Sequence, residues 1–144
     1  MLQTENKNAD TSIDFILIID DDEATVFFHR IMAEEAEVCP TVYTAKHAQE
    51  GLDIFRDVIS RNPTSKGIVF VDINMPVING WEFLEQLRPD WEKLAPQIKI
   101  IMQSSIDDPR DLEKINTHPM IHKFVPKPLS PEVIRLIAGD FKSI

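Results

Sequence analysis

The chain has 144 residues, of which 43% are hydrophobic, a length that suffices for one hydrophobic core and leaves little room for a second. Asp and Glu outnumber Lys and Arg by 24 to 15, and the formal net charge of -9 disfavours binding to nucleic acid or to an anionic membrane surface. The single cysteine, Cys39, excludes an internal disulfide and is typical of a protein of the reducing cytoplasm.

Residues 1–12 are polar and lack the charged and then apolar layout of a signal peptide. We expect them to form a disordered N-terminal tail, followed by one domain over residues 13–144. No apolar run approaches the roughly 20 residues that a membrane helix needs, so we expect no membrane insertion.

Short apolar runs alternate with amphipathic stretches along the chain. The runs predict strands over residues 15–19, 41–44, 68–71, 98–102 and 121–125. The amphipathic stretches predict helices over residues 24–37, 47–59, 81–88, 109–116 and 131–137. Asp108-Pro109 and Ser130-Pro131 each supply an N-cap and a first-turn proline for the last two helices. Five such strand-helix units predict an α/β fold with a parallel sheet and helices on both faces.

Reactive side chains stand just after the carboxyl ends of four predicted strands. They are Asp20, Asp21, Asp72, Ser104 and Lys127. A parallel sheet of this kind binds its ligands beyond the carboxyl ends of the strands, near a switch in strand order. We therefore expect the five side chains to lie together at one edge of the sheet, as the candidate site.

The chemistry of these residue types points to phosphate and a metal. Carboxylates brought together repel one another unless a cation relieves the repulsion, and Mg²⁺ prefers such oxygen ligands. A carboxylate also attacks phosphorus to give an aspartyl phosphate. Asp72 stands alone on the central predicted strand, whereas Asp20 and Asp21 form a pair suited to the metal, so the pattern favours Asp72 as the nucleophile. Lys127 would bind a phosphoryl oxygen, and Ser104 would donate its hydroxyl or a backbone N–H there to another.

Four sequence blocks occur together in one order. They are Ile18-Ile19-Asp20-Asp21-Asp22, Val71-Asp72-Ile73-Asn74-Met75-Pro76 with Gly80, Ile101-Met102-Gln103-Ser104-Ser105, and Phe124-Val125-Pro126-Lys127-Pro128. In this combination the chain resembles the receiver domains of bacterial two-component response regulators over residues 15–141. The resemblance implies a flavodoxin-like (βα)5 fold with strand order 2-1-3-4-5, and a stand-alone regulator similar to those of chemotaxis.

The resemblance also implies roles for the residues of the site. Asp72 is the expected phosphoacceptor, and Lys127 is expected to pair with the phosphoryl group and to precede a cis peptide bond. Asp21 is the expected direct ligand of Mg²⁺. Asp20 is expected to act on the metal largely through water, and Asn74 to contribute its backbone carbonyl.

Three positions are expected to bind the phosphoryl group or to transmit the signal of phosphorylation. Ser104 corresponds to the family's hydroxyl switch residue, and Ser105 is expected to offer its backbone N–H. Phe124 occupies the aromatic switch position, which is commonly tyrosine, so its ring can rotate but carries no phenolic hydroxyl. Ile106 lies two positions after Ser104, and we hypothesise that its apolar side chain slows water entry and lengthens the phosphorylated lifetime.

The expected partners also follow from the resemblance. A histidine kinase or a histidine phosphotransfer protein would donate the phosphoryl group, and the chain would catalyse its own phosphorylation and dephosphorylation rather than turn over external substrates. An unknown downstream protein would bind the face built from the fourth helix, the fifth strand and the fifth helix.

Two other functions compete with this interpretation. A phosphohydrolase of the haloacid dehalogenase type would carry D-x-D-x-T/V after its first strand, but here Asp20-Asp21-Asp22-Glu23-Ala24 ends in alanine, and only Glu132 and Asp140 follow Lys127 as acidic residues. A pseudo-receiver that binds partners without phosphorylation remains the second alternative, although the intact set of reactive residues does not require it.

The four histidines do not indicate a zinc site. Pro119 interrupts the helical spacing of His118 and His122, so we expect neither to be a ligand. His29 and His47 fall in amphipathic helices without a cysteine or carboxylate pattern, and we expect them to be surface or boundary residues.

Overall fold

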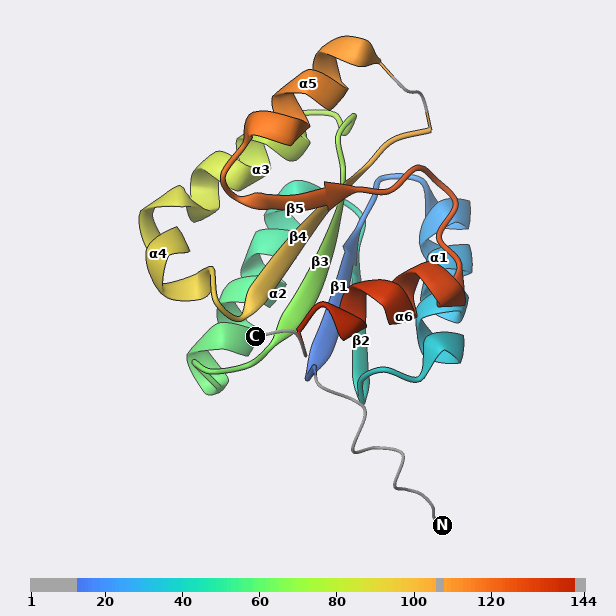
Figure 1. Cartoon of the computed structure of the whole chain (residues 1–144), viewed down its shortest axis with the longest axis vertical. Helices are drawn as coiled ribbons and strands as arrows, with labels where there is room; N and C mark the ends of the chain where they lie inside the picture. The colour runs from blue at the N-terminus through green and yellow to red at the C-terminus, as the bar shows by residue number, and fades with distance from the viewer. Residues whose placement is uncertain (1–12, 106–107, 142–144) are drawn as a thin grey trace.

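The computed structural model describes residues 13–105 and 108–141. Five parallel strands form one sheet in the order β2-β1-β3-β4-β5 (Figure 1). The strands are β1 (Phe15–Ile19), β2 (Thr41–Ala45), β3 (Gly67–Asp72), β4 (Ile98–Gln103) and β5 (Ile121–Phe124). The predicted flavodoxin-like sheet and its strand order are confirmed. The predicted tail over residues 1–12 and the predicted role of Ile106 lie outside the described residues.

Helices connect the strands. They are α1 (Glu23–Ala36), α2 (Ala48–Arg61), α3 (Gly80–Leu87), α4 (Trp91–Leu94), α5 (Pro109–Thr117) and α6 (Pro131–Gly139). The predicted five helices are confirmed as α1, α2, α3, α5 and α6, with ends that differ from the prediction by at most two residues. The 3-10 turn η2 (Arg88–Asp90) and α4 are not predicted, because elements of one turn are too short to show a helical period.

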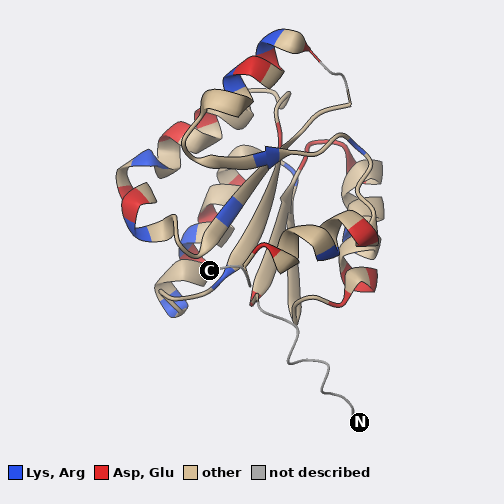
Figure 2. Cartoon of the chain, in the orientation of Figure 1, with Lys and Arg blue, Asp and Glu red and all other residues tan. Residues whose placement is uncertain are grey.

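The sheet separates two hydrophobic cores. α1 and α6 cover one face, and α2, α3, α4 and α5 pack on the other (Figure 1). Successive residues of β1 alternate between the cores: Phe15, Leu17 and Ile19 pack on the α2 side, whereas Ile16 and Ile18 pack on the α1 side. All five are at most 2% exposed. The strands carry few charges, which gather on the helices and loops (Figure 2).

Side-chain caps fix where the helices begin. The capping residues among the described helices are Asp22, His47, Asn79, Asp108 and Ser130. Asp108 and Ser130 were both expected from the sequence as caps, and each accepts a backbone N–H of its helix. Asp22 accepts the N–H of Thr25 at 2.9 Å, so α1 starts directly after the first carboxylates of the candidate site.

β5 is the least enclosed strand of the sheet. It has one strand neighbour, β4, and the pairing shifts register between Ile100 and Ile101. The two middle residues of β5, His122 and Lys123, are exposed. The strand ends at Phe124, one residue earlier than predicted, and Val125 donates its N–H to the carbonyl of Met102 at 3.0 Å. None of the described helices is long and apolar enough to cross a membrane.

Candidate functional site

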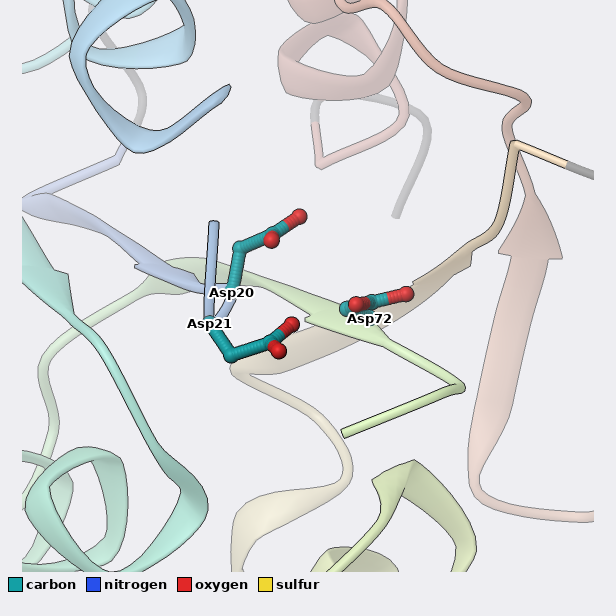
Figure 3. Close-up of side chains that lie close together, drawn as sticks. All are labelled: Asp20, Asp21 and Asp72. Atoms are coloured by element: carbon teal, nitrogen blue, oxygen red, sulfur yellow. The ribbon is translucent and has the colours of Figure 1, made fainter. Parts of the chain in front are cut away.

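Two buried carboxylates lie side by side at the carboxyl edge of the sheet. β1 and β3 pair in register up to Ile19 and Val71, and the next residues are Asp20 and Asp72. Their residues are 2% and 5% exposed. Asp21 follows on the surface, and the three side chains extend into the same space (Figure 3). Their nearest carboxylate oxygens all lie within 4.8 Å of one another, a spacing that suits one hard metal ion.

Lys127 joins the two buried carboxylates from the loop between β5 and α6. Its Nζ lies 2.6 Å from Oδ2 of Asp20 and 3.4 Å from Oδ2 of Asp72. The other oxygens accept backbone N–H groups: Asp22 donates to Asp20 at 2.9 Å, and Asn74 donates to Asp72 at 3.3 Å. Both buried carboxylates are thus oriented by the backbone and share one ammonium group.

The charges in this pocket perturb each other's protonation. Burial raises the pKa of Asp72 to about 6, and the nearby Asp20 carboxylate acts in the same direction against the smaller effect of Lys127. Burial alone would lower the pKa of Lys127, but its contacts with Asp20 and Asp72 outweigh burial and raise it. Lys127 therefore stays charged at neutral pH, while Asp72 requires a nearby cation to hold its negative charge at low cost.

Ser104 and Asn74 lie beside Asp72. Ser104 follows β4, is 2% exposed, and accepts a long hydrogen bond of 3.5 Å from the side-chain amide of Asn74. The carbonyl of Ser104 accepts the N–H of Lys127 at 3.2 Å, which ties the β4–α5 loop to the β5–α6 loop. Ser105 is exposed at the start of the β4–α5 loop, and its expected backbone contact to a phosphoryl group stays a prediction.

The β3–α3 loop brings α3 unusually close to the site. A Cβ on Gly80 would stand 2.8 Å from the carbonyl oxygen of Asp72, so only glycine fits there without a shift. Asn79 and Glu82 form a reciprocal capping box that holds the start of α3. Within the same loop Val77 is 97% exposed and has a positive φ of 67°, which is strained for a β-branched residue.

Phe124 ends β5 opposite Met102 of β4 and packs half-buried against the α2-side core. Phe124 is the last residue of β5, three residues before Lys127 in the β5–α6 loop. The peptide bond between Lys127 and Pro128 is cis, as the resemblance implies. The expected switching role of Phe124 stays a prediction.

The histidines differ from the sequence expectation at one position. His47 is exposed and caps α2, and His118 and His122 form ordinary contacts with the N–H of Met120 and the carboxylate of Asp140. His29 was expected at the surface or the boundary, and this is wrong: it is fully buried, and its Nε2 accepts the N–H of Leu129 at 3.1 Å. The amphipathic pattern of α1 carries no signal for a contact with a residue 100 positions away.

Cys39 lies half-buried between α1 and β2. Its Sγ donates to the carbonyl of Thr41 at 3.3 Å, and burial raises the pKa of the thiol to about 11. The thiol is therefore almost entirely protonated at neutral pH.

Comparison with known proteins assigns the family. The family model described as "Response regulator receiver domain" matches residues 16–138, and the chain belongs to this family. No curated protein matches the chain.

Solved structures share the fold. A response regulator receiver protein from Dyadobacter fermentans has 26% sequence identity and a TM-score of 0.77, over 89% of this chain and 97% of that one. A two-component response regulator from Cytophaga hutchinsonii has 23% identity and a TM-score of 0.83, over 92% and 98%. The chemotaxis protein CheY4 from Vibrio cholerae has 19% identity and a TM-score of 0.67, over 92% and 100%.

Proposed function

We propose that the chain is a response regulator that accepts a phosphoryl group on Asp72 from a phosphohistidine of a histidine kinase or phosphotransfer protein. The observation that carries the proposal is the geometry of Asp72: a buried carboxylate at a strand end, beside two further carboxylates and 3.4 Å from an ammonium group. Membership in the receiver family supports the phosphoacceptor role. We also propose that the protein acts in the cytoplasm, over one domain of residues 13–144.

The transfer requires little covalent chemistry from the protein. An oxygen of Asp72 forms a bond to phosphorus while the bond between phosphorus and the donor imidazole nitrogen breaks, and that nitrogen leaves with the electron pair. Lys127 lies 3.4 Å from Asp72 and is the proposed partner of an equatorial phosphoryl oxygen, and Ser104, whose hydroxyl oxygen accepts the side-chain amide of Asn74, is the proposed donor to another.

The site has the ligand set for Mg²⁺. Asp20, Asp21 and Asp72 offer carboxylate oxygens, and Asn74 is the proposed source of a backbone carbonyl. When bound there, Mg²⁺ supplies positive charge that offsets the carboxylates and the incoming phosphoryl group. One carboxylate oxygen of Asp20 already forms an ion pair with Lys127. The ammonium group and the metal therefore compete for the carboxylate of Asp20.

Phosphorylation is proposed to reach the surface through the two loops that meet at Ser104. A phosphoryl group on Asp72 draws both Ser104 and Lys127, whose backbones are already hydrogen-bonded to each other. The loops lead into α5 and α6, so the proposed binding face for a downstream protein is α5, β5 and α6. Trp81 reports this region, because Lys114 of α5 lies 4.2 Å from its ring centroid.

Incubation with acetyl phosphate and Mg²⁺, followed by mass spectrometry of the intact protein, tests the acceptor. We expect one acid-labile phosphoryl group on the wild type and on Asp90→Asn, an exposed control with the same chemical change. We expect none on Asp72→Asn. A gain that persists in Asp72→Asn would contradict the assignment, continuous phosphate release from many phosphomonoesters would favour a hydrolase, and no gain at all would favour a pseudo-receiver.

Fluorescence of a Trp91→Phe variant, whose remaining tryptophan is Trp81, tests the conformational step. We expect its emission to change on phosphorylation and to stay constant when Asp72→Asn is added. The amide chemical shifts of α5, β5 and α6, measured by NMR, provide a second readout. Full phosphorylation with constant emission and unchanged chemical shifts would contradict signalling through that face. Transfer from a phosphorylated phosphotransfer protein, compared with acetyl phosphate, tests the class of donor.

A further inference from the structure

His29 is a fully buried polar side chain that the proposed chemistry does not use. It lies on α1, within the core between α1 and α6, at 0% exposure. Its Nε2 accepts the backbone N–H of Leu129 at 3.1 Å. Leu129 is itself 2% exposed and lies two residues after Lys127. One hydrogen bond thus connects α1 to the loop that carries the ammonium group of the site.

The acceptor role fixes the protonation of the imidazole. Because Nε2 accepts, a neutral His29 must carry its proton on Nδ1, and burial lowers the pKa of His29 and so favours the neutral form. Nδ1 is buried and has no hydrogen-bond partner among the described residues. A buried unpaired N–H costs free energy that an apolar residue would avoid. The feature that an apolar side chain could not provide here is the acceptor for Leu129.

The Lys127 segment is held from both sides. Before the cis bond, the N–H of Lys127 donates to the carbonyl of Ser104 at 3.2 Å. After it, the N–H of Leu129 donates to His29, and Pro128 between them has no N–H to offer. β5 contributes little further restraint, because it pairs on one side only and its middle residues are exposed. These two hydrogen bonds hold the backbone on both sides of the Lys127–Pro128 bond, from which the Lys127 side chain extends to Asp20 and Asp72.

We propose that His29 is a positioning residue for phosphoryl transfer: by accepting the Leu129 N–H it holds the β5–α6 loop so that Nζ of Lys127 reaches Asp20 and Asp72. This inference rests on phosphorylation of Asp72 as proposed above. His29 itself touches neither the carboxylates nor the phosphoryl group, and its whole effect passes through the backbone of Leu129.

A matched pair of substitutions separates this role from simple packing. His29→Gln and His29→Met both remove the ring and have similar lengths, but only glutamine ends in an oxygen that can accept the Leu129 N–H. If His29 were needed only for packing, methionine would serve at least as well in this apolar core. Ile134→Val, in the same core, removes a methylene group and leaves the hydrogen bond intact, so it controls for lost stability.

Two readouts are measured on the full chain: amide hydrogen exchange at Lys127 and Leu129, and the rate of phosphorylation by acetyl phosphate with Mg²⁺. For His29→Met we expect exchange about tenfold faster and phosphorylation about tenfold slower, the change that loss of one hydrogen bond produces. His29→Gln and Ile134→Val should both stay within about threefold of wild type. As a further check, His29→Met should slow a Lys127→Met variant no further, because its effect requires the ammonium group.

Each outcome decides the proposal. Equal rates in His29→Met and His29→Gln, or a faster methionine variant, would overturn it. If the wild type takes up no phosphoryl group, the proposed function fails, and hydrogen exchange alone then decides on His29: faster exchange at both amides in His29→Met, but not in His29→Gln, supports loop positioning, and unchanged exchange overturns it.

Discussion

The central strands and the edge strand of the sheet hold their functional residues in different ways. β1 and β3 are buried at every residue and pair on both sides, so the ladder itself sets the positions of Asp20 and Asp72. β5 pairs on one side with a shifted register, and Lys127 lies three residues beyond its end. The carboxylates of the site are therefore positioned by the sheet, whereas its cation is positioned by a loop that hydrogen bonds to Ser104 and His29 hold in place.

Removal of that cation should have the largest effect. Lys127→Met leaves two buried carboxylates without an ammonium partner, which should lower the free energy of unfolding by about 3 kcal/mol at pH 8. It should also slow phosphorylation by more than about a hundredfold, because the ammonium group that stabilises the negative phosphoryl oxygens is lost. Urea unfolding without Mg²⁺ and the mass-based phosphorylation rate measure the two effects.

Lys46→Met provides the control for this comparison. Lys46 lies at the same edge of the sheet, but its ion pair with Glu23 is exposed and should matter little. We expect its phosphorylation rate to stay within about twofold of wild type. Equal losses in the two lysine variants would show that the buried position of Lys127 confers nothing special.

The cost of a charge on the central strand should appear as pH-dependent stability. The folded-state pKa of Asp72, about 6, lies above its ordinary value of 3.8, so the folded protein binds this proton more tightly than the unfolded chain does. Ionisation therefore lowers stability as the pH rises from about 4 to 6, and the cost is complete above pH 6. Asp72→Asn cannot ionise and should raise the free energy of unfolding by up to about 3 kcal/mol at pH 8.

Urea unfolding of Asp72→Asn in EDTA at several pH values measures this gain. It should be complete at pH 8, decrease below pH 6, and fall to about half at pH 5. Asp90→Asn, at an exposed position, should show no such trend. A gain that is the same at pH 5 and pH 8 would mean that ionisation of Asp72 is not its source.

A smaller effect on stability should distinguish a glycine packed against the site, Gly80, from an exposed glycine, Gly139. Gly80→Ala places a Cβ 2.8 Å from the carbonyl oxygen of Asp72, where the backbone of β3 cannot move away. We expect a net loss of about 1 kcal/mol in stability, although alanine favours a helix. Gly139→Ala, where nothing lies within 4 Å, should instead gain up to about 1 kcal/mol. Thermal unfolding of both variants measures the difference, and a stabilised Gly80→Ala would show that α3 can shift.

The smallest effect is expected on the edge strand. Phe124 is half-buried, so a hydroxyl added by Phe124→Tyr can extend toward water without displacing the core. We expect less than about a twofold change in phosphorylation rate, and an unchanged Trp81 response. A larger change in the Trp81 response, at an unchanged rate, would assign the missing hydroxyl a role in signalling rather than in chemistry.

The sequence predicts the residues that gather at the ends of the strands, but it does not predict features that depend on contacts between distant parts of the chain. The alternation of apolar runs and amphipathic stretches predicts all five strands, and the residues after them predict that Asp20, Asp72 and Lys127 lie together. It misses η2 and α4, whose single turns show no period. It also misplaces His29, because a buried histidine on α1 depends on a backbone N–H supplied from the β5–α6 loop. The raised pKa of Asp72 could not be predicted from the sequence either, because it depends on burial that only the folded sheet provides.

The inert thiol of Cys39 makes the chain convenient for site-specific labelling. Thiol reagents attack the thiolate, and a pKa of about 11 leaves almost none of it at neutral pH. Val77→Cys would place a second thiol at a position of the β3–α3 loop that is 97% exposed. A maleimide dye would then attach preferentially at residue 77 with the natural cysteine still in place.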